Sequence, residues 1–186
     1  MLYLIRHGKT EWNELHRLQG RTDVPLSEAG REMARRAHDA CLNVHFDVCY
    51  TSPLIRARET AEILLRGRDV PITEDARLME MCFGEYEGIT NIFDKPECPL
   101  RPLFLDPARY TASVGGAETF AELFRRTGAF LNDIVKPLLA QGKDVLIVGH
   151  GAMNSSIVCQ IRGLPIDQFW TCGIENCKLM RFENYR

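Results

Sequence analysis

The sequence predicts an α/β protein, a three-layer α/β/α sandwich around a mostly parallel central sheet. Two short apolar runs, at residues 2–5 and 145–148, have the composition of strands that are buried on both faces. Amphipathic helical segments alternate with these and other short strand-like segments. Strands that alternate with helices form a sheet covered by helices on both sides. With 186 residues and 45% hydrophobic content, the chain can form one well-packed domain, and we expect a single domain over residues 1–186.

The individual elements follow from periodicity and from residues that begin or end helices. We expect strands at residues 2–5, 46–51, 70–73, 145–148 and 178–182, and helices at 28–42, 54–65, 118–139 and 152–162. Ser27 is a good N-cap for the first helix. Ser52-Pro53 ends the second strand, and Pro137 predicts a kink in the long third helix. Residues 9–25 are expected to form a loop that folds back over the end of the first strand.

A proline-rich segment at about 89–115 predicts a lid-like insertion. It carries four prolines and three aromatic residues, namely Pro96, Pro99, Pro102, Pro107, Phe93, Phe104 and Tyr110. Prolines at this density exclude a long helix or a central strand, and loops of this length in compact domains are often functional lids. We therefore expect this segment to cover a pocket and to influence its specificity.

Composition narrows the classes of partner. Lys and Arg number 23 and Asp and Glu 25, a net charge of -2, so no global positive field attracts nucleic acid or an anionic membrane. No apolar run approaches the roughly 20 residues that span a bilayer. The 7 cysteines include no C-x-x-C pair and no signal peptide precedes them, which favours reduced thiols in a cytoplasmic protein.

Two of the predicted strands end in the same way. The first runs into Arg6-His7-Gly8 and the strand at 145–148 runs into Gly149-His150-Gly151. In an open parallel sheet, ligands bind beyond the carboxyl ends of the strands. These endings therefore predict a two-histidine active site formed by His7 and His150. Arg56 and Arg58 are further candidates, because basic side chains in the first turn of a helix oppose the helix dipole unless an anion binds there.

Four ordered blocks of residues carry a family resemblance. They are Arg6-His7-Gly8-x-Thr10-x-Trp12-Asn13, Thr51-Ser52-Pro53-Leu54-x-Arg56-Ala57-x-x-Thr60-Ala61, Glu80-x-x-Phe83-Gly84-x-x-Glu87-Gly88 and Gly149-His150-Gly151. Together they resemble the histidine phosphatase superfamily, the phosphoglycerate mutase-like enzymes. Weaker landmarks are Gly115-Gly116-Ala117-Glu118 and Asn176-Cys177-Lys178-Leu179. The resemblance spans nearly the whole chain and implies the phosphoglycerate mutase-like form of the three-layer fold.

The resemblance also implies roles for the site residues. His7 would be the nucleophile, taking the phosphoryl group on a ring nitrogen as a phosphohistidine that water then hydrolyses. Arg6, Arg56 and a protonated His150 would bind the equatorial phosphoryl oxygens. Glu80 would be the general acid that protonates the leaving alkoxide, and then the base that accepts a proton from water. The residues that would line the pocket are Thr10, Asn13, Gln19, Gly20 and Gly151.

Several assignments stay open. Spacing alone leaves Glu80, Glu85 and Glu87 nearly equivalent, and only the resemblance selects Glu80. Lys9 stands where the family usually has an acidic or polar residue, so it either contacts an anionic substrate or is solvated. No metal and no other cofactor is implied, because the 5 histidines are scattered along the chain. The histidines expected at the surface are His16, His38 and His45.

We expect a phosphatase acting on a small-molecule phosphate monoester. The alternative is a cofactor-dependent phosphoglycerate mutase, but family mutases tend to be longer and to carry an arginine after the catalytic glutamate, where this chain has Met81. Family mutases also carry paired arginines in the insertion, whereas Arg101 and Arg109 stand apart. A non-catalytic phosphoryl-ligand binding domain would have lost a catalytic residue, and all are present. The substrate, such as a sugar phosphate, nucleotide or α-ribazole phosphate, stays open, and a homodimer is possible.

Overall fold

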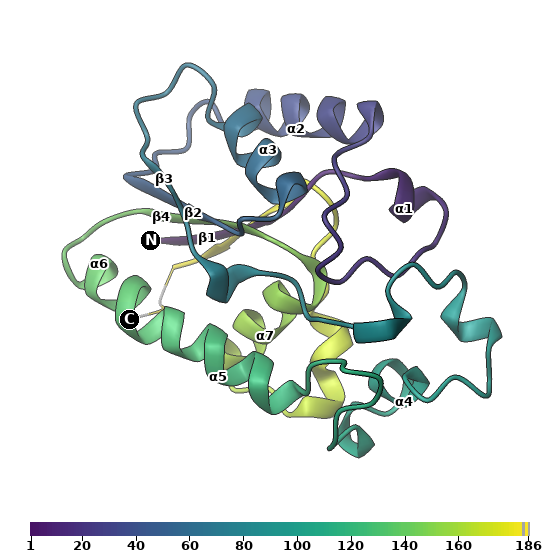
Figure 1. Cartoon of the computed structure of the whole chain (residues 1–186). Helices are drawn as coiled ribbons and strands as arrows, with labels where there is room; N and C mark the ends of the chain where they lie inside the picture. Colours follow the sequence, from purple (N-terminus) through teal and green to yellow (C-terminus); the bar gives the residue numbers. More distant parts are fainter. Residues whose placement is uncertain (184, 186) are drawn as a thin grey trace.

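The strands form one mixed sheet at the centre of the protein (Figure 1). The computed structural model describes residues 1–183 and 185. Within these residues the sheet has the order β3-β2-β4-β1-β5. The bounds are β1 (Leu2–Arg6), β2 (Val48–Thr51), β3 (Ile72–Glu74), β4 (Val145–Gly149) and β5 (Leu179–Phe182). Only β5 is antiparallel to its neighbour among these strands, so the predicted three-layer, mostly parallel fold is confirmed.

Helices cover both faces of the sheet (Figure 1). One face carries α2 (Glu28–Ala40) and α3 (Ile55–Leu64), and the other carries α5 (Phe120–Phe130), the π-helical η5 (Leu131–Val135), α6 (Lys136–Ala140) and α7 (Gly151–Arg162). The shorter helices are α1 (Glu11–Glu14), η1 (Ala76–Leu78), η2 (Gly84–Tyr86), η3 (Ile92–Asp94), α4 (Arg101–Leu105), η4 (Pro107–Arg109) and η6 (Ile166–Cys172). None of the helices in the described part of the chain is both long and apolar enough to cross a membrane.

The apolar strands are buried on both faces because a strand turns alternate side chains to opposite sides. In β1, Leu2 and Leu4 pack into the core under α5 and α7, whereas Tyr3 and Ile5 pack into the core under α2 and α3. β4 divides its side chains between the same two cores. This explains why β1 and β4 appear in the sequence as continuous apolar runs.

Two local features differ from the sequence prediction. The irregularity in the long third helix lies before Pro137 and is the π-helical turn η5. Pro137 itself lies in the first turn of α6, where the backbone N–H that proline lacks is not needed. Residues 9–25 include the short helix α1, with Thr10 as its N-cap and Asn13 completing a capping box. A helix this short has no periodicity for a sequence pattern to detect.

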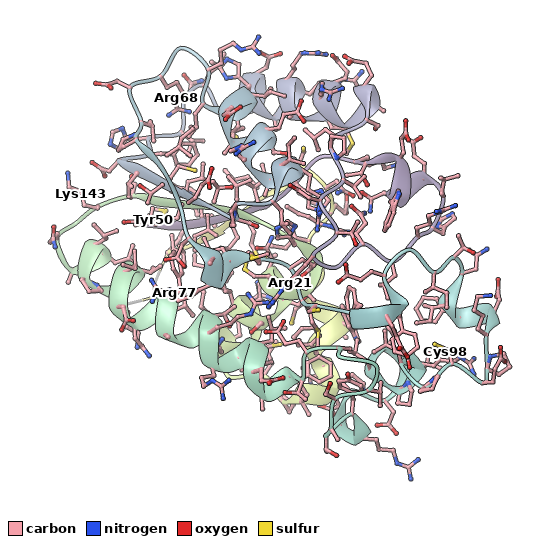
Figure 2. The ribbon with its side chains drawn as sticks, in the orientation of Figure 1. Arg21, Tyr50, Arg68, Arg77, Cys98 and Lys143 are labelled. Atoms are coloured by element: carbon pink, nitrogen blue, oxygen red, sulfur yellow. The ribbon has the colours of Figure 1, made fainter. Side chains whose placement is uncertain are left out.

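The 89–115 segment is anchored to the core. Leu100 and Leu103 are fully buried and join the core beneath α5 and α7. The Trp170 indole N–H donates to the Leu103 carbonyl at 2.8 Å, which ties the segment to η6. Figure 2 shows Cys98 on the same side of the molecule as α4, away from the strands. As the prolines predict, this region has only short helical turns.

Candidate active site

The candidate catalytic residues meet at the carboxyl ends of β1 and β4. These strands are parallel neighbours, and Arg6 at the end of β1 pairs with Gly149 at the end of β4. The His7 amide donates to the Gly149 carbonyl at 2.9 Å. The His7 and His150 rings then lie with their centroids 5.2 Å apart. The structure thus brings the two histidines together, as expected where parallel strands end side by side.

His7 is held as a neutral imidazole with a defined tautomer. Its Nδ1 lies 2.6 Å from the Gly8 carbonyl oxygen. Since a carbonyl can only accept, Nδ1 carries the proton and Nε2 keeps its lone pair. Burial, together with the Arg56 and Arg6 guanidinium groups, holds the pKa of His7 well below its usual range. Gly8 is needed here because a Cβ would lie 2.4 Å from the Gly30 carbonyl oxygen.

Two arginines bring positive charge to the histidines. Arg56 is fully buried, and its Nη1 and Nη2 donate to the carbonyls of Thr22 and Gly20 at 2.9 and 2.6 Å. Arg6 is anchored more loosely, with Nη1 3.4 Å from the Ile174 carbonyl oxygen. Burial lowers the pKa of both guanidinium groups. Fixed, buried cations with donors to spare are suited to a phosphate group.

Glu80 caps the first turn of α7. Its Oε1 accepts from the amides of Met81 at 2.8 Å and Met153 at 3.0 Å, and its Oε2 accepts from the Ala152 amide at 3.2 Å. A carboxylate at a helix N-terminus satisfies orphan amides and complements the dipole. The sequence does not predict this role, because it joins residues far apart in the chain. The Glu80 carboxylate also acts on the Arg6 and Arg56 guanidinium groups and offsets part of their positive charge.

A buried ion pair holds the loop that carries Glu80. The Arg126 guanidinium pairs with the Glu118 carboxylate at 2.7 Å and donates to the carbonyls of Met79 at 2.7 Å and Glu80 at 3.2 Å. Glu118 in turn accepts from the Cys82 amide at 3.2 Å. The sequence reasoning missed Arg126, although Glu118 belongs to one of the weaker landmarks. The pair fixes the backbone on both sides of the candidate acid.

The three glutamates of the third block have different surroundings. Glu80 lines the cavity, whereas Glu85 is exposed. Glu87 accepts from the amides of Arg21 at 2.9 Å and Thr22 at 2.8 Å, and so holds the loop that carries Arg21 (Figure 2). The same loop supplies the Gly20 carbonyl to an arginine of the site. The structure therefore separates three residues that spacing leaves equivalent.

The site opens into a cavity of about 220 Å³. The expected site residues in its wall are Arg6, His7, Asn13, Gln19, Gly20, Arg56, Glu80 and Gly151. Wall residues that the sequence did not single out for the site are Arg17, Leu18, Phe83, Ala152, Ser155, Trp170 and Gly173. Phe104 of the 89–115 segment also lines the cavity, on the side expected for a lid. The exposed Lys9 lies outside this wall.

Thr10 does not fit its expected place in the pocket wall. It is fully buried, where its hydroxyl donates to Gln19 Oε1 at 3.0 Å and its amide donates to Asn13 Oδ1 at 3.0 Å. Both contacts use the amide oxygens, which leaves the NH₂ groups of Asn13 and Gln19 to donate elsewhere. Thr10 therefore orients two side chains of the wall, because capping α1 draws it into the interior.

The His150 side chain has no hydrogen-bond partner in the described part of the chain. It is fully buried beside His7, and neither ring nitrogen has a hydrogen-bond partner among the described residues. Burial, then the Arg56 guanidinium, holds the pKa of His150 well below its usual range. Burial and the neighbouring positive charges therefore favour the neutral form of His150 when no anion is bound.

The other histidines lie away from this cavity. His16 and His45 are exposed as expected, while His38 is half-buried, with Nδ1 2.8 Å from the Leu64 carbonyl oxygen. Asp47 follows His45 by two residues in the sequence, and the fold brings both near Asp144, with ligand atoms within 4.8 Å of one another. Both carboxylates already pair with ammonium groups, of Lys143 and the N-terminus.

Comparisons with known proteins identify the family of this chain. The model of the histidine phosphatase superfamily (branch 1) matches residues 2–186. The chain is 30% identical to 2,3-bisphosphoglycerate-dependent phosphoglycerate mutase 2 of Gloeobacter violaceus, over 99% of this chain and 85% of that protein. It is 28% identical to phosphoserine phosphatase 1 of Hydrogenobacter thermophilus, over 94% of this chain and 82% of that protein. The structure of Bacillus stearothermophilus YhfR superposes with a TM-score of 0.87 at 32% identity, covering 99% of this chain and 92% of that chain. This protein belongs to the histidine phosphatase superfamily.

Proposed function

We propose that the protein is a phosphatase that hydrolyses a small-molecule phosphate monoester through a phosphohistidine on His7. The observation that carries the proposal is the hydrogen bond of 2.6 Å from Nδ1 to the Gly8 carbonyl, which leaves the Nε2 lone pair for attack in a cavity that Arg6 and Arg56 also line. A neutral, oriented imidazole is the form of histidine that acts as a nucleophile.

The reaction proceeds in two balanced steps. The first step begins with Glu80 in its protonated form. Nε2 of His7 forms a bond to phosphorus while the ester P–O bond breaks, and Glu80 gives its proton to the departing alkoxide and becomes a carboxylate. In the second, water attacks the phosphohistidine, its proton passes to the Glu80 carboxylate, and the P–N bond breaks to restore His7. Positioned acid–base catalysis of this kind is worth about 10²–10⁴-fold.

The arginines balance the charge on the transferring group. Charge-assisted hydrogen bonds from Arg6 and Arg56 each contribute about 1.5–3 kcal/mol, and they strengthen as charge spreads over the equatorial oxygens. His150 is neutral in the free site and has an N–H to donate. A bound phosphoryl dianion supplies the negative charge that favours its protonated form. With this charge compensation from side chains, the proposed reaction uses no metal ion.

Phosphatase is favoured over mutase by the position of the arginines. Met81 follows the candidate acid, and Arg101 and Arg109 line a separate cavity beside α4 rather than the one around His7. A mutase remains the second candidate because one relative named above is a phosphoglycerate mutase. The free cysteines and the net charge of -2 support a small-molecule substrate in a reducing, cytoplasmic setting.

The test is phosphate release from a panel of phosphate monoesters that includes 3-phosphoglycerate, with and without 2,3-bisphosphoglycerate. Wild type and His7→Ala are compared with EDTA present. We expect release that survives chelation and is lost in His7→Ala. Formation of 2-phosphoglycerate without phosphate release would identify a mutase, and absence of both reactions would favour a non-catalytic binding domain.

A further inference from the structure

A second cavity adjoins the catalytic one. It has a volume of about 280 Å³, and it shares Asn13, Arg17, Leu18 and Phe104 with the wall of the catalytic cavity. Its outer wall includes Phe93 and other residues of the 89–115 segment. The two cavities are therefore neighbours, and Phe104 lies in the walls of both.

The surfaces along this path are largely aromatic. The Phe104 ring stacks on Trp170 with centroids 5.2 Å apart, and it also lies 5.8 Å from the Phe83 ring and 5.7 Å from the Phe93 ring. Phe93, which also lines the outer cavity, is 55% exposed. An apolar or planar group would bury this surface.

Arg17 lies in the walls of both cavities. The Arg17 guanidinium lies 5.8 Å from the centroid of the Trp12 ring, which holds it beside the opening. Among the described residues, no carboxylate lies within ion-pair distance of it. The walls of the outer cavity carry no acidic side chain in the described part of the chain. An exposed arginine beside an apolar surface is suited to bind an anionic group that is attached to an apolar body.

We propose that the outer cavity binds the leaving group of the substrate, and that this group carries an apolar body and a second anionic group recognised by Arg17. The inference rests on the proposed function, because it takes the catalytic cavity as the phosphoryl site. It narrows the substrate class to organic phosphates with two separated anionic groups.

The test uses straight-chain phosphate monoesters that end in a carboxylate or in the isosteric carboxamide, with chains of two to eight carbons. For each length, the ratio of kcat/KM for carboxylate over carboxamide is measured in wild type, Arg17→Gln and Arg58→Gln. Arg58 is the matched control, since it is an exposed arginine that pairs with Glu62 and Glu74 outside both cavities. The two esters of each length share the same phosphate group and the same intrinsic reactivity, so these contributions cancel in the ratio of kcat/KM.

We expect wild type to prefer the carboxylate at one or a few lengths, and Arg17→Gln to reduce that preference about tenfold while Arg58→Gln retains it. The proposal is overturned if no length shows a preference in wild type, or if Arg17→Gln retains it. If none of the esters turns over, the proposed function fails independently of this proposal. The preference for carboxylate over carboxamide is then measured as a ratio of Kd values by calorimetry, with His7→Ala and with the double variant His7→Ala/Arg17→Gln.

Discussion

Replacing Arg126 with methionine removes the cation that holds the Glu80 loop. The Arg126 and Glu118 side chains are only 15% and 8% exposed. The substitution leaves the buried Glu118 carboxylate with only the longer contact to Arg21, at 3.5 Å, and frees the Met79 carbonyl. Breaking a buried pair by removing one partner costs about 3–5 kcal/mol. Methionine keeps most of the side-chain volume, so the loss of the ion pair dominates over cavity formation. We expect the free energy of unfolding to fall by about that amount.

The assay is urea denaturation at pH 7 with Arg125→Met as the control. Arg125 is the exposed neighbour of Arg126 on α5, so the same substitution there should change stability by less than about 0.5 kcal/mol. A double-mutant cycle with Glu118→Gln isolates the pair, and its effects should be strongly non-additive. The reasoning is refuted if Arg126→Met costs less than about 1 kcal/mol, or if the cycle is additive.

Further predictions concern the site itself. The pKa of His7 and of His150 is lowered in the folded protein from 6.5, so the unfolded chain binds more protons as the pH falls through that value. The free energy of unfolding should therefore fall by up to about 1.4 kcal/mol per pH unit per histidine. Between pH 7.5 and 5.5, denaturation of His150→Ala should show a smaller loss of stability than that of wild type. Gly8→Ala, whose Cβ would lie 2.4 Å from a backbone oxygen, should destabilise by about 1–3 kcal/mol in the same assay. Glu80→Gln should lower kcat for phosphate release about 10²–10⁴-fold, and a smaller effect for an activated aryl ester would identify the lost function as acid catalysis. Phe104→Ala should change relative kcat/KM among monoesters of different bulk, and equal losses for all would show that the 89–115 segment does not set specificity.

The features that the sequence predicts are those that depend on local pattern. Continuous apolar runs identify β1 and β4 because both of their faces are buried. The endings of these two strands predict that His7 and His150 lie at one edge of the sheet, where the structure places them. The unfavourable positions of Arg56 and Arg58 in the first turn of α3 also indicate a site. Only Arg56 lies fully buried in the cavity wall, whereas Arg58 pairs with Glu62 and Glu74.

Features that depend on contacts between distant segments are not predictable in this way. Thr10 is expected in the pocket because it belongs to the first block, yet capping α1 turns it inward. Arg126 of α5 donates to the Met79 carbonyl, in a loop far earlier in the chain, and so joins two distant segments. Arg17 escapes sequence reasoning because an exposed arginine in a polar stretch has no pattern of its own, and only the fold brings it to the cavity.

The central claim is that His7 carries the phosphoryl group. Wild-type enzyme is mixed with a phosphate monoester that it hydrolyses. The mixture is quenched in base within milliseconds and digested for mass spectrometry. We predict a phosphoryl group on the peptide that contains His7, formed before phosphate is released and absent from His7→Ala. Phosphate release with no phosphorylated peptide at any time, and with His7→Ala as active as wild type, would contradict the claim.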